Sequence, residues 1–196
     1  MVAGILLAAG AGSRFGGGKL VHRLPDGEPL GLRAWRNLCK ALPHVTVAVR
    51  AGDRDVEQLF RSAGAHVVIC ADAHLGMGHT LACAVNATSE AEGWVIALAD
   101  MPSVDPATIR SLAEQLTAGA GIVVPVYRGQ RGHPVGFAAR FGEALTRLAG
   151  DAGARSVLRD HPESIERMEV DDPGVLQDVD TREDVHRLQS GGGAPA

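Results

Sequence analysis

Apolar runs of strand length alternate with runs of helical spacing along most of the chain. Residues 3–9 (AGILLAA) are continuously apolar and are followed by a glycine, which is typical of a strand buried on both faces. β-Branched or apolar segments predict further strands at residues 44–50, 66–70, 94–100, 121–126, 133–138 and 165–170. Apolar positions three and four residues apart predict helices at residues 29–42, 53–64, 78–88, 105–116, 140–160 and 181–189.

Two of the predicted helices begin with capping signals. Asp105 is expected to be an N-cap, with Pro106 as the first helical residue. Thr181 is expected to cap the last helix together with Asp184, three residues further on. These signals fix where the two helices start, which periodicity alone leaves open.

The order of the elements predicts an α/β fold whose sheet is mainly parallel, because strands alternate with helices. The strand at 133–138 is expected to pair with the strand at 121–126 across the polar RGQRG turn. Residues 1–189 are interpreted as one domain. The tail at 190–196 (SGGGAPA) has no side chain able to anchor it and is predicted to be disordered.

Composition and charge narrow the class of protein. The chain has 196 residues, of which 45% are hydrophobic and only 4% aromatic, so the core is built from Ala, Val, Leu and Ile. The net charge is −4 and the basic residues are spread out, which argues against a nucleic acid or a membrane surface as partner and favours a small anionic ligand.

The cysteines and the N-terminus bear on the cellular compartment. Cys39, Cys70 and Cys83 form no C-x-x-C pair, and their odd number argues against a disulfide framework, so we interpret them as buried, inert thiols. The chain begins directly with a strand, without a basic segment before an apolar one, and no apolar run reaches the length of a membrane span. A cytoplasmic location is therefore predicted.

The glycine-rich stretch at residues 6–20 (LLAAGAGSRFGGGKL) fits some phosphate-binding patterns and not others. A P-loop would require glycine at Ser13 and a hydroxyl at Leu20, and a dinucleotide-binding fingerprint would require glycine at Phe15. Gly12, Gly16 and Gly18 match the pattern of short-chain dehydrogenases. That class also needs a Tyr-x-x-x-Lys pair, whereas the only tyrosine, Tyr127, is followed four residues later by an arginine.

Charged residues in and opposite this stretch suggest a nucleoside triphosphate. The glycines let backbone N–H groups approach phosphate oxygens, while Arg14 and Lys19 add cationic donors. Asp100 follows a predicted buried strand and precedes Met-Pro, a place where a carboxylate can hold Mg²⁺. The structural alternatives are a surface loop with two solvated cations, and an aspartate that only caps the turn before Pro102.

Five ordered segments of the sequence resemble the MobA-like nucleotidyltransferases, and in detail their molybdenum cofactor cytidylyltransferase branch. LLAAGAGSRFGGGKL resembles the L-x-A-G-G-x-S-x-R-M-G-x-x-K motif, with the A-A-G of the cytidylyl branch at Ala8 to Gly10. ALADMP (97–102) resembles the G-D-M-P metal loop. The other matches are RGHPVGF (131–137), GDAGARSVLRDHP (150–162) and LQDVDTREDV (176–185). The departures are Phe15 for the usual Met and Arg182 for the usual Pro.

The resemblance implies a fold and a set of site residues. It implies a single-domain, three-layer Rossmann-like nucleotidyltransferase fold with a mainly parallel mixed sheet. Lys19, Arg14 and Asp100 would be the catalytic residues. The nucleotide-binding positions would be Leu7, Ala8, Ala9, Gly10, Gly12, Lys19, Asp72, Gly76 and Gly78. Acceptor-binding positions would be His133, Asp151 and Arg155, and metal ligands would be Asp100 and Asp180, although Asp180 could equally serve only the start of the last helix.

The reaction implied by the resemblance transfers CMP from CTP to the terminal phosphate of molybdopterin and releases pyrophosphate. Mg²⁺ is the expected metal, with Mn²⁺ as an alternative, and a molybdoenzyme or its chaperone would receive the product. The alternatives are guanylyl transfer to the same cofactor and nucleotidyl transfer to another small phosphorylated acceptor. More distant alternatives are an NAD(P)-dependent short-chain oxidoreductase and a binding protein without turnover.

Overall fold

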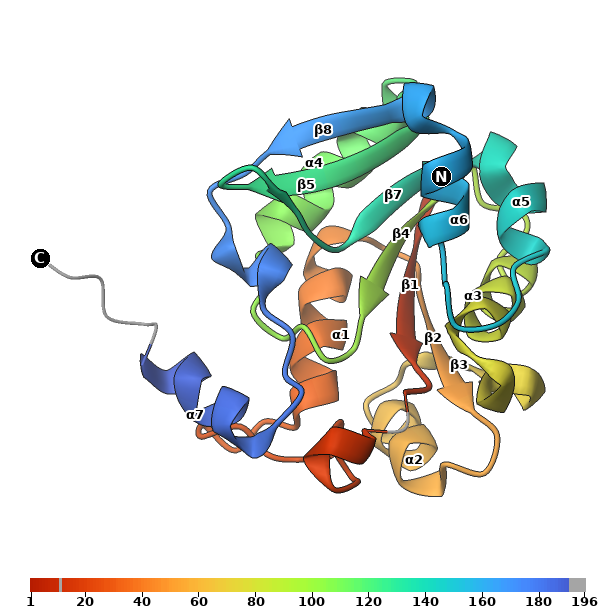
Figure 1. The fold of residues 1–196 in the computed structure, drawn as a ribbon. Helices are drawn as coiled ribbons and strands as arrows, with labels where there is room; N and C mark the ends of the chain where they lie inside the picture. The colour runs from red at the N-terminus through yellow and green to blue at the C-terminus, as the bar shows by residue number, and fades with distance from the viewer. Residues whose placement is uncertain (11, 191–196) are drawn as a thin grey trace, which may run out of the picture.

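The structure is a computed structural model that describes residues 1–10 and 12–190. Eight strands form one mixed sheet of order β3-β2-β1-β4-β7-β5-β6, with β8 paired to β5 (Figure 1). Their bounds are β1 (Val2–Ala8), β2 (Val45–Arg50), β3 (His66–Cys70), β4 (Gly93–Leu98), β5 (Ile122–Tyr127), β6 (Gln130–Arg131), β7 (Val135–Ala138) and β8 (Ile165–Glu169). β1, β2, β3 and β4 pair in parallel, as do β5 and β8, and β7 is antiparallel to both β4 and β5.

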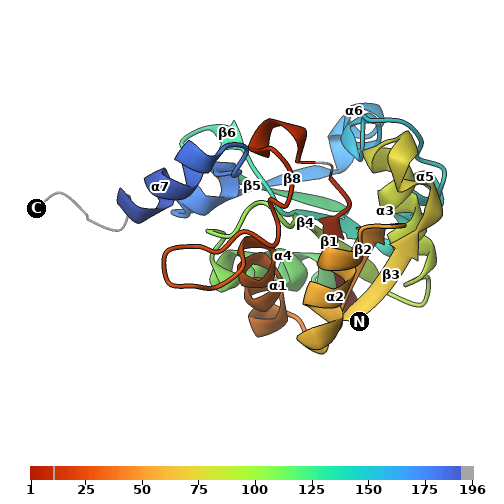
Figure 2. The same ribbon diagram turned by 90° about the horizontal axis from the view of Figure 1, so that it is seen from below.

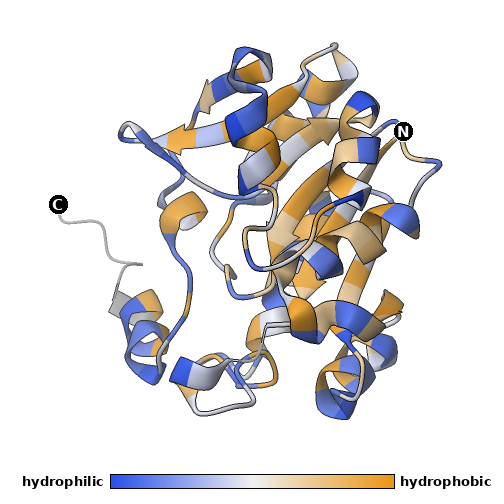
Figure 3. Ribbon diagram, turned by 45° about the vertical axis from the view of Figure 1, so that its right-hand side comes forward, coloured by the Kyte–Doolittle hydropathy of each residue, from blue (hydrophilic) through white to orange (hydrophobic). Residues whose placement is uncertain are grey.

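Helices cover both faces of this sheet (Figures 1 and 2). The helices are α1 (Leu30–Ala41), α2 (Arg54–Ser62), α3 (Met77–Asn86), α4 (Pro106–Thr117), α5 (Gly142–Thr146), α6 (Arg155–Asp160) and α7 (Arg182–Ser190). The first hydrophobic cluster packs α1, α2 and α4 against one face, and the second packs α3, α5 and α6 against the other. The apolar colouring of the strands between these layers is visible in Figure 3. The prediction of a three-layer α/β fold with a mainly parallel mixed sheet is confirmed.

The predicted helix starts are also confirmed. The carboxylate of Asp105 accepts a hydrogen bond from the backbone N–H of Ala107 at 2.7 Å, and Pro106 opens α4. At the start of α7, Asp184 Oδ2 accepts from the backbone N–H of Thr181 at 2.7 Å, and Thr181 Oγ1 accepts from the N–H of Asp184 at 3.3 Å. This reciprocal pair is a capping box.

The predicted helical region at 140–160 is not continuous. A 3-10 turn at Ala139–Phe141 leads into α5, and α6 begins only at Arg155, so residues 147–154 form a loop. Gly150 and Gly153 in this loop have positive φ values of 66° and 53°, a conformation that ends helices. The predicted disordered tail falls on residues 191–196, which lie outside the described residues, whereas Ser190 is the last residue of α7.

The pairing predicted for 133–138 is confirmed, but with an interruption. Arg131 pairs with Val126, and Gly136 pairs with Val123. Five positions separate Arg131 from Gly136, whereas three separate their partners on β5, so two extra residues bulge out of the strand. The bulge contains His133, whose backbone N–H donates to the carbonyl of Val175 at 2.9 Å.

The interpretation of the cysteines as buried, inert thiols is wrong. Cys70 at the end of β3 and Cys83 on α3 form a disulfide, with their Cα atoms 5.9 Å apart. Cys39 is a free thiol, and it is exposed because it lies beside the apolar stripe of α1 rather than in it. Within residues 1–10 and 12–190, no helix combines the length and the apolarity that crossing a membrane requires.

Candidate functional site

The ends of neighbouring parallel strands meet at one edge of the sheet. Leu7 of β1 pairs with Leu98 of β4, so the loops that follow these two strands leave the sheet side by side. The first loop leads to Lys19 and the second to Asp100. The return segment after β8 crosses the same edge, because the backbone N–H of Val179 donates to the carbonyl of Asp100 at 2.9 Å. Three segments that are distant in sequence are thereby brought together.

The conformation of the opening loop depends on its glycines. Gly12 and Gly16 flank a short 3-10 turn with φ values of 57° and 86°, in the left-handed region that glycine tolerates best. Phe15 in this turn is buried, and it packs edge-on against the ring of His22. The Arg182 guanidinium lies 5.5 Å from the centre of the Phe15 ring. The two residues that depart from the family motif therefore contact each other and join the opening loop to α7.

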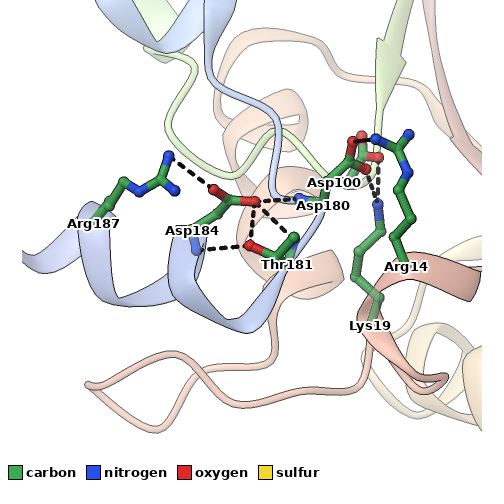
Figure 4. Close-up of polar contacts among 7 residues, drawn as sticks. All are labelled: Arg14, Lys19, Asp100, Asp180, Thr181, Asp184 and Arg187. Carbon is green, nitrogen blue, oxygen red and sulfur yellow. Dashed lines mark hydrogen bonds and ion pairs between the residues drawn. The ribbon is translucent and has the colours of Figure 1, made fainter.

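Four charged side chains form a compact cluster at this edge (Figure 4). Lys19 Nζ lies 2.7 Å from Asp100 Oδ2 and 3.4 Å from Asp180 Oδ1. Arg14 Nη1 lies 2.7 Å from Asp180 Oδ2. The Lys19 side chain is only 11% exposed, so its ammonium group is largely shielded from water and interacts with the carboxylates more strongly than a surface lysine does.

The side chain of Asp180 does not serve the start of α7. The capping box is made by Thr181 and Asp184, and Asp180 contributes only its backbone N–H, which donates to Asp184 Oδ2 at 3.0 Å. Hydrogen bonds from Thr181 hold the pKa of Asp184 below its usual range. Arg187 Nη1 lies 3.2 Å from the other oxygen of Asp184. The carboxylate of Asp180 thus faces Lys19 and Arg14, as Figure 4 shows.

The residues present fit a hard divalent cation. Asp100 and Asp180 come from different loops, yet both reach the same ammonium group, so one cation can contact both carboxylates. Carboxylate oxygens are the ligands that Mg²⁺ and Mn²⁺ prefer. Among the described residues, no group of three His, Cys, Asp or Glu side chains is placed to hold a metal. Further ligands would have to come from phosphate oxygens and water, which is common for Mg²⁺.

A first cavity, of about 410 Å³, opens beside this cluster, and we call it the nucleotide cavity. Five of the predicted nucleotide-binding residues line it, namely Leu7, Ala9, Gly10, Lys19 and Gly76. Four do not. Ala8 is buried at the end of β1, and Asp72 is exposed on the turn after β3. Gly12 and Gly78 do not line the cavity.

Gly78 has a packing role that the motif did not reveal. Its backbone N–H donates to the carbonyl of Gly150 at 2.7 Å, and a Cβ at this position would lie 2.7 Å from the carbonyl oxygen of Ala149. Gly76 is equally confined, with a Cβ position 2.4 Å from the carbonyl carbon of Gly150. These glycines hold the start of α3 against the loop before α6.

Sequence reasoning missed Arg50, which lines the nucleotide cavity at the end of β2. Its Nε atom is buried and has no hydrogen-bond partner among the described residues. Since β2 and β4 lie on opposite sides of β1, Arg50 and Asp100 stand on opposite sides of the cavity. The available signal was a single arginine at the end of an apolar strand, directly before a turn.

A second cavity, of about 350 Å³, adjoins the first, and we call it the acceptor cavity. All three predicted acceptor residues line it, that is His133, Asp151 and Arg155, together with Arg131, which sequence reasoning did not single out. Its walls are otherwise mostly apolar. The two cavities share Leu7, Met77, Leu98 and Asp151, so they are direct neighbours.

His133 is held as a neutral imidazole in this wall. Burial lowers its pKa, and the positive charge of Arg155 acts in the same direction, while the negative charges of Asp100 and Asp178 oppose them. Its Nδ1 atom is buried without a hydrogen-bond partner among the described residues. The bulge between β6 and β7 therefore carries a polar ring into a cavity wall that is mostly apolar and also contains Arg131, Asp151 and Arg155.

Comparison with known proteins gives a family and several relatives. The model of the MobA-like NTP transferase domain matches residues 4–165. Nicotine blue oxidoreductase from Paenarthrobacter nicotinovorans is 29% identical over 196 residues, which is 95% of this chain and 96% of that protein.

The crystal structure of Rv0371c from Mycobacterium tuberculosis H37Rv superposes with a TM-score of 0.84 at 27% identity, covering 96% of this chain and 97% of that one. Its complex with manganese gives 0.80 at 26% identity, covering 96% and 98%. A nucleotidyl transferase from Methanothermobacter thermautotroptrophicus superposes with 0.83 at 22% identity, covering 97% of each chain, which shows the shared fold.

Proposed function

The chain belongs to the MobA-like NTP transferase family and is a nucleotidyltransferase, and from this premise we propose that it transfers CMP from CTP to the terminal phosphate of molybdopterin. The observation that carries the proposal is the pair of adjoining cavities. One contains Lys19 and Asp100, the other contains His133 and Arg155, and they share a wall. Transfer between two bound substrates requires neighbouring binding sites, because the attacking phosphate must approach the α-phosphorus directly.

In the nucleotide cavity, the backbone of residues 7–10 would face the base, and the glycine-rich turn would expose N–H groups to the phosphates. Lys19 and Arg14 would neutralise charge on the triphosphate, exchanging their carboxylate partners for phosphate oxygens. Asp100 and Asp180 would hold Mg²⁺ or Mn²⁺, and the manganese complex of Rv0371c supports a metal of this kind. When bound, the metal would withdraw charge from the phosphates and help to align them.

In the acceptor cavity, the apolar walls suit a flat heterocycle such as a pterin better than a sugar, which needs many hydrogen-bonding partners. Arg131 and Arg155 would attract the anionic end of the acceptor. His133 would offer a neutral ring nitrogen as a hydrogen-bond partner. The attacking phosphate is already ionised at neutral pH, so no side-chain nucleophile is needed. A molybdoenzyme or its chaperone would receive the product.

The proposal is tested by measuring pyrophosphate release with CTP, GTP, ATP and UTP, each with Mg²⁺ and molybdopterin. We expect release with CTP, and loss of that release when molybdopterin is omitted. Release with GTP alone would replace the cytidylyl assignment by a guanylyl one. Release that requires a different phosphorylated acceptor would retain the transferase and overturn molybdopterin as the acceptor.

One observation favours a second candidate, an oxidoreductase that reduces a conjugated heteroaromatic compound. Nicotine blue oxidoreductase matches nearly the full length of this chain at 29% identity. On this reading, the nucleotide cavity would hold a nicotinamide nucleotide and the acceptor cavity the compound to be reduced. Loss of NADH or NADPH absorbance with nicotine blue, without any pyrophosphate-releasing activity, would favour this candidate over the transferase.

A further inference from the structure

The Cys70–Cys83 disulfide lies directly behind the nucleotide cavity. Cys70 is the last residue of β3 and pairs in register with Arg50, which lines the cavity. Cys83 lies on α3, whose first residue, Met77, also lines the cavity. The bond therefore closes a short loop of chain, residues 71–82, that begins and ends on elements of the site.

This loop supplies a large part of the cavity wall. Ala73, His74, Gly76, Met77 and Thr80 all line the cavity, and all lie between the two cysteines. Cys70 Sγ also contacts the backbone carbonyl of Thr80, at 3.8 Å. The disulfide is therefore connected to one side of the cavity wall. Lys19 and Asp100 lie on the opposite side.

Few side-chain contacts hold residues 71–75 in place, whereas Gly76 packs against Gly150 at the far end of the segment. Between residues 71 and 77, only the side chain of Ala73 is buried, while Leu75 and Met77 are 50% and 46% exposed. The hydrogen bonds of this half, from His74 and Gly76, stay within the turn itself. A segment with few buried contacts opens locally at low free-energy cost, so its ends determine how well it is ordered. The end at Cys70 is tied to α3 by the disulfide, and the end at Gly76 is held by its packing against Gly150.

We propose that the Cys70–Cys83 bond is a reducible clamp that orders the nucleotide-binding loop, so that a dithiol reductant weakens nucleotide binding. A thiolate of the reductant attacks Cys83 Sγ, because Cys83 is half-buried whereas Cys70 is fully buried. The Cys70 thiolate leaves and takes up a proton. The second thiol of the reductant then displaces the Cys83 thiolate, so the protein gains two thiols and the reductant becomes a disulfide. The inference rests on the proposed nucleotide site.

The test compares the oxidised protein with the same protein treated with dithiothreitol. The dissociation constant for CTP is measured by calorimetry, and hydrogen exchange is followed in peptides covering residues 71–79. Reduction is expected to weaken CTP binding about tenfold, a typical size for coupling between two sites, and to accelerate exchange in this segment. A Cys70→Ser, Cys83→Ser double variant should match the reduced protein and no longer respond to dithiothreitol.

Control variants separate the clamp from other effects. Cys39→Ser removes the free thiol and should retain the full response to dithiothreitol. If the double variant does not fold, Cys83→Ala alone replaces it, since Cys83 is the less buried partner. Equal CTP affinity and equal exchange in both redox states would overturn the clamp. If CTP binds in neither state while exchange at 71–79 still rises on reduction, the nucleotide assignment fails and the clamp on the loop remains.

Discussion

The two cavities lie side by side but are built by different interactions. The nucleotide cavity is organised by charge, with Lys19 between two carboxylates and Arg14 beside them. The acceptor cavity is organised by packing, with apolar walls, a bulged strand and a histidine that burial keeps neutral. On the proposed function, the charged cluster would neutralise the triphosphate, while the apolar walls would pack against the acceptor and Arg131 and Arg155 would bind its anionic end. Variants should therefore fall into two groups with different kinetic signatures.

The largest effect is expected for Lys19→Ala. The variant removes the cation that would neutralise the reacting phosphates and leaves Asp100 and Asp180 without their shared partner. We expect kcat/KM to fall by about 10²–10³-fold, the range for loss of one electrostatic contact to a transition state. Steady-state pyrophosphate release measures this change. Lys40→Ala, on the exposed side of α1, is the matched control, and near-normal turnover of Lys19→Ala would remove Lys19 from the mechanism.

A smaller effect is expected for Arg50→Ala. Arg50 lines the nucleotide cavity across β1 from Asp100, so its loss should weaken nucleotide binding rather than slow chemistry. The KM for the nucleotide should rise about tenfold, consistent with loss of one hydrogen bond from a charged donor, while the KM for the acceptor stays unchanged. Arg54→Ala, at the exposed start of α2, is the control. A selective rise of the acceptor KM would assign Arg50 to the other cavity.

The sequence predicted well those elements that depend only on the local pattern of residues. Buried strands and amphipathic helices are determined by nearby residues, and the capping residues Asp105 and Thr181 mark helix starts through hydrogen bonds two or three residues away. The cluster of Lys19 and Asp100 was anticipated because motifs at the ends of two strands meet whenever those strands pair in parallel.

The features that sequence did not reveal depend on contacts between distant segments. The disulfide requires that the end of β3 lie against the second turn of α3, which spacing alone does not specify. The bulge at His133 requires the register of β6 and β7 on β5. Gly78 was assigned to the nucleotide on its motif, although its packing against Ala149 already requires a glycine. Arg50 belongs to no recognisable motif, because a single charged residue at the end of a strand is common.

Arg155→Ala tests the comparison at the acceptor cavity. Arg155 begins α6 and lines only the acceptor cavity of the two, so its loss should raise the KM for the acceptor and leave the KM for the nucleotide unchanged. Because Arg155 is exposed and screened by solvent, the rise should be about fivefold and should shrink at high salt. Arg159→Ala, which pairs with Asp160 on the same helix, controls for the loss of charge. Equal changes in both KM values would mean that the cavities are not separate.

The smallest effect concerns the pH dependence of stability through His133. Burial lowers its pKa in the folded protein, so at mildly acidic pH the unfolded chain binds more protons at this position than the folded one. The free energy of unfolding should therefore decrease as pH falls below about 6.5, the pKa of an unfolded histidine. The lowered pKa of Asp184 acts in the same direction but only below about pH 4, the range of an unfolded aspartate, so the two contributions separate.

His133→Asn should flatten the first decrease in a series of urea titrations, whereas His44→Asn, at an exposed histidine, should not. An unchanged profile for His133→Asn would mean that burial does not keep its ring neutral, and the contrast between a cavity organised by charge and one organised by packing would lose its main support on the acceptor side.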